Sequence, residues 1–307
     1  MPQLTREIKR RIKSIGNTKK ITKAMELVSA AKMRKAVNNV LTSRAYADLA
    51  WNAVLDLAAR TESKYHPLLI KREVNKIGLV LITSNRGLCG SFNHQIINKT
   101  IAFIKQQKQN NDLEIELILI GKKGREVMLK RKYSIIAEFP KLDITTQIEE
   151  IRSLSHLVIE DYLANKYDEV VIAYTDFISS LSQKPRILQL LPLEPEKQDE
   201  YLGEVESAKQ KGSTKSEAHA EKFEYLFEPS AEEVLSAMLP RLIEVKIYQA
   251  ILESDASEHS ARMMAMQNAS LAASDMIDSL TLAYNQARQA AITTELADIS
   301  GGKAALE

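Results

Sequence analysis

Hydrophobic positions follow two different periods along the chain, helical at both ends and strand-like in the middle. Near the N-terminus, apolar residues recur at spacings of three, four or six that line one face of a helix, at Leu4, Ile8, Ile12, Ile15, Ile21, Met25 and Val28. The stripe thins to small side chains over 29–36 and broadens again from Trp51. A neighbouring helix can approach closely where the side chains are small, so the pattern predicts a helix with a packed partner.

The middle of the chain contains short, continuous apolar runs rich in β-branched residues. They lie at 77–83, 115–120, 134–139 and 169–175. Continuous rather than alternating runs are typical of strands covered on both faces. Helical patterns at 97–104 and 148–158 separate them, and this alternation predicts a small, open, mainly parallel sheet. The run 187–193 is a candidate edge segment.

Two long stretches lack both glycine and proline, at 17–66 and 241–300. Each is expected to form a helix of 50 or more residues, about 75–90 Å long at 1.5 Å per residue. Helices of this length in water need a partner along them. The predicted fold class is therefore α/β: a long antiparallel coiled coil of the N- and C-terminal helices, with a small Rossmann-like open α/β domain between them.

Proline, glycine and capping residues indicate where the elements end. His66-Pro67 is expected to end the first helix. Ser230 and Glu233 have the spacing of a capping box at the start of the last. Pro240 is expected to kink or restart that helix near 241, and Gly301-Gly302 to stop it. The predicted organisation is a shaft helix over 1–66, an α/β domain over 67–195, a charged, mobile insertion with its connector over 196–229, and a second shaft helix over 230–307.

Composition is ordinary for a soluble protein, with 45% hydrophobic and 27% charged residues. Cys89 is the single cysteine, which excludes an intramolecular disulfide and fits a reducing compartment. We find neither a secretory signal pattern nor the unbroken apolar stretch of about 20 residues that a membrane span needs. The bacterial cytoplasm, or an equivalent compartment, is the expected location.

Basic residues gather at the N-terminus. Residues 1–35 contain eleven lysines and arginines against only Glu7 and Glu26. Residues 257–307 contain three basic against six acidic groups. Such polarity suits nucleic acid, anionic lipid or an acidic protein surface, and the charge pattern alone does not choose among them.

Two glycine-containing segments follow predicted strands, where an α/β fold places a phosphate-binding turn. SNRGLCGSFN (84–93) lacks the third glycine of the dinucleotide fingerprint and the Lys-Ser/Thr pair of a P-loop, and GKKG (121–124) fails the same tests. Tight structural turns are favoured over nucleotide binding. Cys89 and His94 make only a weak nucleophile–base pair, so a buried or half-buried structural thiol is favoured. The scattered histidines indicate no zinc site, and we expect no cofactor and no metal.

The last helix has an unusual surface. Between 261 and 297 it contains ten alanines and few charges. A plain coiled-coil seam is one explanation, but an exposed seam normally has flanking charges, which are sparse here. A slender, smooth helix enclosed by other protein is the interpretation that we favour.

Three segments of the chain resemble the γ subunit family of the rotary ATP synthase. They are 8–36 (IKRRIKSIGNTKKITKAMELVSAAKMRKA), 86–90 (RGLCG), and a C-terminal signature in two parts, SEHSARMMAMQNAS (257–270) and YNQARQAAITTELADISGG (284–302). They occur in the family's order and at nearly its spacing. Pro240 and the segment 196–222 depart from the family pattern, and that segment has no cysteines, so the thiol switch of chloroplast γ subunits is not available.

The resemblance implies a central rotor shaft with no catalytic chemistry of its own. In this family the terminal helices form a shaft inside a ring of three α and three β subunits, and the α/β domain sits with subunit ε on the ring of c subunits. Ion flow turns the rotor and shifts the catalytic sites of β between conformations. The implied location is the cytoplasmic face of the bacterial inner membrane, peripheral to it through the complex.

The resemblance also assigns residues to interfaces. Met25, Glu258 and Arg262 match the coupling contact with β, and Arg34 is counted among the β contacts. The remaining implied β contacts are the polar "catch" and the helix tip, with Arg288 and Gln289 in the first and Thr293 and Glu295 in the second. The implied turn of the α/β domain contains Arg86, Gly87 and Cys89.

Two alternatives come from other functional classes. One is a nucleotide-dependent enzyme with helical arms, which no phosphate-binding motif supports. The other is a basic coiled-coil adaptor for nucleic acid, which would bind DNA with strong salt dependence. The resemblance implies that the chain binds no nucleic acid.

Overall fold

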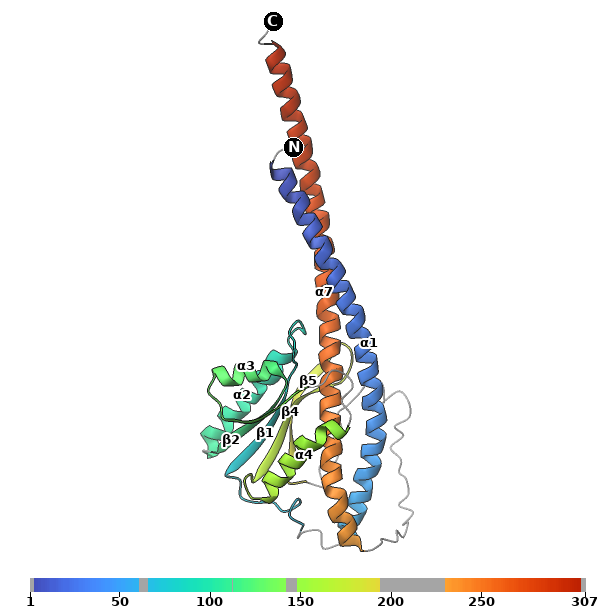
Figure 1. Ribbon diagram of the computed structural model, residues 1–307, viewed down its shortest axis with the longest axis vertical. Coiled ribbons are helices and arrows are strands. Elements are labelled where there is room, and N and C mark those ends of the chain that lie inside the picture. Colours follow the sequence, from blue (N-terminus) through green and yellow to red (C-terminus); the bar gives the residue numbers. More distant parts are fainter. Residues whose placement is uncertain (1–2, 61–65, 112, 142–147, 194–229, 305–307) are drawn as a thin grey trace. The chain divides into compact units, whose positions relative to one another are not determined.

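A computed structural model describes residues 3–60, 66–111, 113–141, 148–193 and 230–304 of the chain (Figure 1). The insertion predicted at 196–222 lies outside these residues. The helices are α1 (Gln3–Arg60), α2 (Phe92–Asn111), α3 (Lys122–Lys130), α4 (Ile148–Leu163) and α7 (Ala231–Ala304). The strands are β1 (Lys76–Ile82), β2 (Glu114–Ile120), β3 (Ile135–Phe139), β4 (Glu169–Phe177) and β5 (Gln183–Leu191). The chain forms two compact units, 1–29 with 262–307 and 30–261, and both α1 and α7 contribute to each.

The five strands form one sheet in the order β3-β2-β1-β4-β5. β1, β2, β3 and β4 run parallel, which confirms the predicted open sheet, and the edge segment predicted at 187–193 belongs to β5, which pairs antiparallel with β4. The prediction that every strand is covered on both faces was wrong for β3. Its side chains alternate between half-buried and exposed because it lies at the edge of the sheet.

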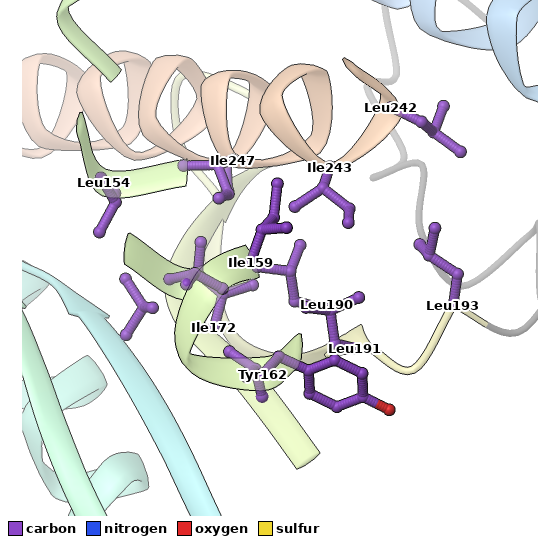
Figure 2. Close-up of a cluster of buried hydrophobic side chains, with 14 of the residues drawn as sticks. Leu154, Ile159, Tyr162, Ile172, Leu190, Leu191, Leu193, Leu242, Ile243 and Ile247 are labelled. Atoms are coloured by element: carbon purple, nitrogen blue, oxygen red, sulfur yellow. The ribbon is translucent and has the colours of Figure 1, made fainter. Parts of the chain in front are cut away.

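Successive residues of the central strands pack into two separate cores because strand side chains point alternately to opposite faces. On one face, α4 and α7 cover the sheet and α1 joins them (Figures 1 and 2). On the other face, α2 and α3 pack against the sheet through Ile96, Ile104 and Met128. Figure 2 shows the first core, in which Ile172 of β4 and Leu190 of β5 lie beneath Ile243 and Ile247 of α7. The sheet is thus buried between two helical layers.

The segment GKKG was predicted as a tight turn, but it opens a helix. Gly121 has φ +94° and precedes α3, and a Cβ there would overlap the carbonyl oxygen of Thr83. Thr83 Oγ1 also accepts the N–H of Gly124 at 2.9 Å, so the first turn of α3 lies against the end of β1. α3 escaped prediction because glycine in a short helix weakens the sequence pattern.

Within the unit 30–261, α1 and α7 pack side by side and antiparallel. Arg44 Nη2 lies 2.8 Å from Glu253 Oε1, and the Lys246 ammonium lies 3.9 Å from the centroid of the Trp51 ring. As α1 advances from 44 to 51, its partners on α7 recede from 253 to 246. The predicted antiparallel pairing of the terminal helices is confirmed here.

Within the unit formed by 1–29 and 262–307, the buried positions form a seam of mostly small side chains, with Arg262 and Met266 as the large ones. Thr5, Thr22 and Ser29 of α1 are buried, and so are Ser270 and Ala273 of α7. Small residues let two helix backbones approach closely.

Two members of the predicted apolar stripe do not enter this seam. Ile21 is 61% exposed and Val28 is 55% exposed, each next to a buried small polar residue. The stripe that was predicted to face a packed partner is therefore not covered by this chain at these two positions.

The ends of α7 differ in part from the predictions. Ser230 Oγ accepts the N–H of Glu233 at 3.2 Å, which confirms the helix cap. The predicted restart near 241 was wrong, because Pro240 lies inside a single helix. Burial of Leu239, Leu242 and Ile243 around it offsets the hydrogen bond that proline removes. The predicted stop at Gly301-Gly302 was also wrong, since α7 continues to Ala304, and each helical glycine costs only about 1 kcal/mol.

Candidate functional site

The carboxyl ends of β1 and β4 mark the place where an open α/β sheet usually binds ligands. The strand order reverses there, with β2 on one side of β1 and β4 on the other. In this chain the turn that follows β1 closes on itself. Asn93 Oδ1 accepts the N–H of Ser84 at 3.0 Å, and Asn93 Nδ2 donates to Ser84 Oγ at 2.7 Å and to the Cys89 sulfur at 3.2 Å. The side chain of Asn93, at the start of α2, thus occupies polar groups of the turn that a phosphate would need.

The same turn supports the segment that follows β3. Asn85 Nδ2 donates to the carbonyl oxygen of Lys141 at 2.7 Å, while Asn85 Oδ1 accepts the N–H of Lys122 at 3.3 Å. The Phe92 ring, at the start of α2, lies 5.8 Å from the Lys141 ammonium. The turn therefore positions Lys141.

Helix α7 lies across this edge of the sheet. Ser257 Oγ donates to the carbonyl oxygen of Thr175 at 3.1 Å, and Ser260 Oγ donates to that of Ser180 at 2.6 Å. A Cβ on Gly90 would lie 3.9 Å from the carbonyl oxygen of Ala261, so the turn after β1 also approaches the helix. The chain's own helix occupies the region where related architectures hold a ligand.

A buried ion cluster joins α7 to the segment after β3. Lys141 Nζ lies 2.9 Å from Asp255 Oδ1 and 2.6 Å from Glu258 Oε2, and all three side chains are at most 6% exposed. Burial alone would lower the pKa of Lys141, but the two carboxylates outweigh it and raise the pKa above its ordinary value. Lys141 is therefore charged throughout the physiological range.

A second buried cluster joins α7 to α1 and to the sheet. Glu253 accepts hydrogen bonds from Arg44 at 2.8 Å and from Gln249 at 3.2 Å. Asp176 of β4, fully buried, pairs with Arg186 of β5 at 2.9 Å. Burial raises the pKa of Glu253 to about 7, with a further contribution from Asp176, although Arg44 acts in the opposite direction.

These two clusters attach elements of the chain to one another rather than bind a ligand. Among the described residues, no group of three or more His, Cys, Asp or Glu side chains could hold a metal ion. Each cluster instead pairs carboxylates of α7 with cations from other elements. None of the helices described here combines the length and apolar character that crossing a bilayer demands.

The residues assigned to the turn of the α/β domain lie between β1 and α2. Arg86 and Gly87 are exposed there, and Cys89 is 2% exposed, which confirms a buried thiol. The Cys89 sulfur contacts Asn93 at the start of α2.

The residues assigned to the β-subunit contact fall into exposed and buried groups. Arg34 of one unit and Arg288, Gln289, Thr293 and Glu295 of the other are exposed, and Met25 is half-buried. Glu258 is 5% exposed and bonded to Lys141, and Arg262 is 8% exposed. The exposed set is available to a partner, whereas Glu258 is engaged within its own unit.

Sequence reasoning missed the cations of the two clusters, Lys141, Arg44 and Arg186. One signal was available: the run QAILESDASEHS (249–260) contains three acids and no lysine or arginine, within a helix predicted to pack along a partner helix. Buried acids need cations. Nothing in the local pattern says where in the chain those cations lie.

The architecture defines a class of proteins in which a small open α/β domain is inserted between two long paired helices. A family model described as ATP synthase matches residues 4–306. Similar curated proteins are named ATP synthase gamma chain, for example from Pelotomaculum thermopropionicum, 44% identical over 307 residues and 100% of both chains, and from Trichlorobacter lovleyi, 42% identical over 97% of this chain and 96% of its relative. The chain therefore belongs to the ATP synthase gamma chain family.

Solved structures share the fold. The central stalk and c-ring structure of the Tetrahymena thermophila mitochondrial ATP synthase contains a chain that matches with a TM-score of 0.59 and 23% identity, covering 81% of this chain and 99% of that one. A chain in the OSCP/F1/c-ring structure of the Euglena gracilis mitochondrial ATP synthase matches with a TM-score of 0.63 and 18% identity, covering 99% and 94%.

Proposed function

We propose that this chain is the central rotor shaft of an F-type ATP synthase. Its partners are the α and β subunits of an α3β3 ring, the ε subunit and the ring of c subunits. Rotation driven by ion flow presents different faces of the shaft to each β subunit. The complex holds the chain at the cytoplasmic face of the bacterial inner membrane.

One observation supports this proposal most directly: the unit of 1–29 and 262–307 exposes large apolar side chains along both helices. Leu271 is 59% exposed, Leu282 is 62% and Leu296 is 60%, in addition to Ile21 and Val28. In a free chain these apolar side chains would contact water, and a surrounding protein would remove them from it. A surrounding layer of apolar side chains that makes no hydrogen bonds or ion pairs to the helices is compatible with rotation of the shaft.

The shaft acts through contacts whose free energies differ between the conformations of the β subunit. A rotor can shift a β subunit between conformations only if its contacts favour one conformation over another. We assign these contacts to the exposed Arg34, Arg288, Gln289, Thr293 and Glu295, with Met25 at the coupling contact. The basic N-terminal segment complements acidic loops of β. Glu258 and Arg262, which the resemblance assigns to the same contact, are buried in this chain.

The catalytic chemistry belongs to the β subunits. In this chain α7 covers the carboxyl edge of the sheet, and Asn93 bonds the turn after β1 internally. Both features favour a structural role for the α/β domain over nucleotide binding.

The test is reconstitution with purified α and β subunits. The wild-type chain should co-purify with them and increase their ATPase activity. Arg288→Ala combined with Gln289→Ala should leave assembly intact and reduce ATP turnover about tenfold or more, since each lost charged hydrogen bond is worth roughly 1.5–3 kcal/mol.

The matched control is Lys105→Ala with Gln106→Ala, a cation–amide pair exposed on α2. This control should turn over ATP at the wild-type rate. A wild-type chain that remains alone in the presence of α and β would contradict the proposed function, and wild-type rates in the Arg288/Gln289 variant would remove those two residues from the contact.

A further inference from the structure

The Lys141 cluster has the geometry of a two-point attachment to a helix. Asp255 and Glu258 are three residues apart, so they project from the same face of α7 about one turn apart. One ammonium bonds both carboxylates, at 2.9 and 2.6 Å. A single contact to a helix lets it pivot, whereas two contacts one turn apart resist both rotation about the axis and sliding along it.

Stability alone does not explain this cluster. One buried cation faces two buried carboxylates, and burying such groups costs more than packing apolar residues of the same volume. Apolar packing is non-directional, so a helix held only by apolar contacts can shift its register. Buried charges fix one register, because any displacement leaves an ion without its partner.

Lys141 is itself held by the turn that follows β1. Its carbonyl oxygen accepts a hydrogen bond from Asn85, and Asn85 in turn accepts the N–H of Lys122 at the start of α3. The attachment therefore extends from α7 to the turn after β1 and to α3. On the same stretch of α7, Ser257 and Ser260 make neutral hydrogen bonds to carbonyl oxygens at and beyond the end of β4.

We propose that Lys141 is the positioning residue that transmits torque between the α/β domain and α7, through its bonds to Asp255 and Glu258. This inference rests on the proposed function as a rotor shaft. It gives Glu258 an intramolecular role, in which the carboxylate keeps the helix in register with the domain that the rotor drives.

The experiment compares two rates on complete ATP synthase reconstituted into lipid vesicles. ATP hydrolysis and ATP-driven ion uptake are measured at equal amounts of assembled complex, and their ratio reports coupling. A residue with a merely structural role changes the amount of complex and leaves this ratio unchanged. Lys141→Met should retain ATP hydrolysis and lose most of the ion uptake per ATP.

A neutral variant keeps the test decisive if Lys141→Met does not assemble. Lys141→Met combined with Asp255→Asn preserves the shape of the cluster and leaves Glu258, which the resemblance assigns to the β contact, unchanged. The one carboxyl group that stays buried becomes neutral by taking up a proton. This variant should assemble like the wild type and still lose coupling. The matched control is Lys123→Met, which removes an exposed lysine that pairs with Glu126 at 2.8 Å in the same domain, and its coupling should equal that of the wild type.

The outcomes separate the two proposals. The wild-type chain is first added to a complex from which this subunit has been removed. If it restores no ion uptake there, the shaft function is overturned, and the torque role is overturned with it. If the wild type is active and the neutral variant couples normally, the torque role of Lys141 is overturned and the shaft function stands. The proposal is supported only if the neutral variant hydrolyses ATP at the normal rate and has lost most of its ion uptake.

Discussion

Two stretches of α7 have similar compositions and opposite environments. Residues 249–260 (QAILESDASEHS) and 285–297 (NQARQAAITTELA) both mix small, polar and charged side chains with a few apolar ones. All residues of the first stretch are buried, whereas those of the second are exposed except for the half-buried Ala287 and Ala291. Composition therefore does not determine burial along this helix. The first stretch is covered by its own chain, and the second is left for other subunits.

The difference explains where each stretch places its charges. The buried stretch can hold Glu253, Asp255 and Glu258 because its cations belong to the same chain, at fixed distances. The exposed stretch has Leu296 at 60% exposure and Ile292 at 49%, which suits enclosure by a protein that is not bonded to it. Substitutions in the first stretch should affect the free chain, and those in the second only the complex.

The largest effect on the free chain is expected from Lys141→Met. It leaves Asp255 and Glu258 as buried carboxylates without their cation, which should lower the free energy of unfolding by about 3–5 kcal/mol. Urea denaturation of the full chain measures this change. The exposed Lys123→Met should shift it by about 0.5 kcal/mol or less. Equal effects of the two substitutions would show that the buried cluster contributes no more than a surface pair.

A leucine pair on one helix tests the comparison most directly. Leu252 is 1% exposed and Leu296 is 60% exposed. Leu252→Ala should destabilise the unit 30–261 by about 2–4 kcal/mol, because it opens a cavity in a packed core. Leu296→Ala should stay within about 0.5 kcal/mol.

Both leucine variants are measured in the full chain by denaturation monitored at Trp51, which lies in that unit. If Leu296→Ala costs as much as Leu252→Ala, the second stretch is not free of its own chain in solution.

A smaller, pH-dependent effect is expected from Glu253→Gln. The pKa of Glu253 is raised from 4.5 to about 7, so the folded state favours the protonated carboxyl. The stability that this group contributes is fully present below pH 4.5 and is lost as pH rises through 7. Glutamine resembles the protonated form, so the variant should gain about 1–3 kcal/mol relative to wild type between pH 5 and pH 8.

Parallel denaturation curves at the two pH values measure the change in Glu253→Gln, with the exposed Glu160→Gln on α4 as the control. A constant difference between Glu253→Gln and wild type across this range would show that Glu253 does not bind a proton near neutrality.

Local sequence patterns predicted the helices and strands that are determined by neighbouring residues. The continuous apolar runs of β1, β2 and β4 gave correct strands, since both faces of those strands are buried in one domain. The absence of glycine and proline indicated two long helices, and Ser230 with Glu233 indicated the start of α7. Each of these signals lies within a few residues of the feature that it predicts.

Features that depend on distant contacts were not predictable in this way. The two ends of the Lys141–Glu258 pair are 117 residues apart, and those of the Arg44–Glu253 pair are 209 apart. The buried seam at Thr22 and Ser29 was not predicted, because polar residues do not contribute to an apolar stripe. The small size of these two side chains nevertheless allows close packing. The exposed residues proposed for the β contact came from family resemblance, since solvent-exposed arginines such as Arg288 give no signal of their own.

The pairing of α1 with α7 also has a consequence for biosynthesis. Val40 and Trp51 are buried against residues near the other end of the chain, such as Leu252 and Lys246. A ribosome adds about 5–20 residues per second, so the 209 residues between Arg44 and Glu253 take roughly 10–40 s to synthesise. Throughout that interval the apolar face of the nascent first helix lacks its partner, and transiently exposed apolar surface of this kind is prone to aggregation.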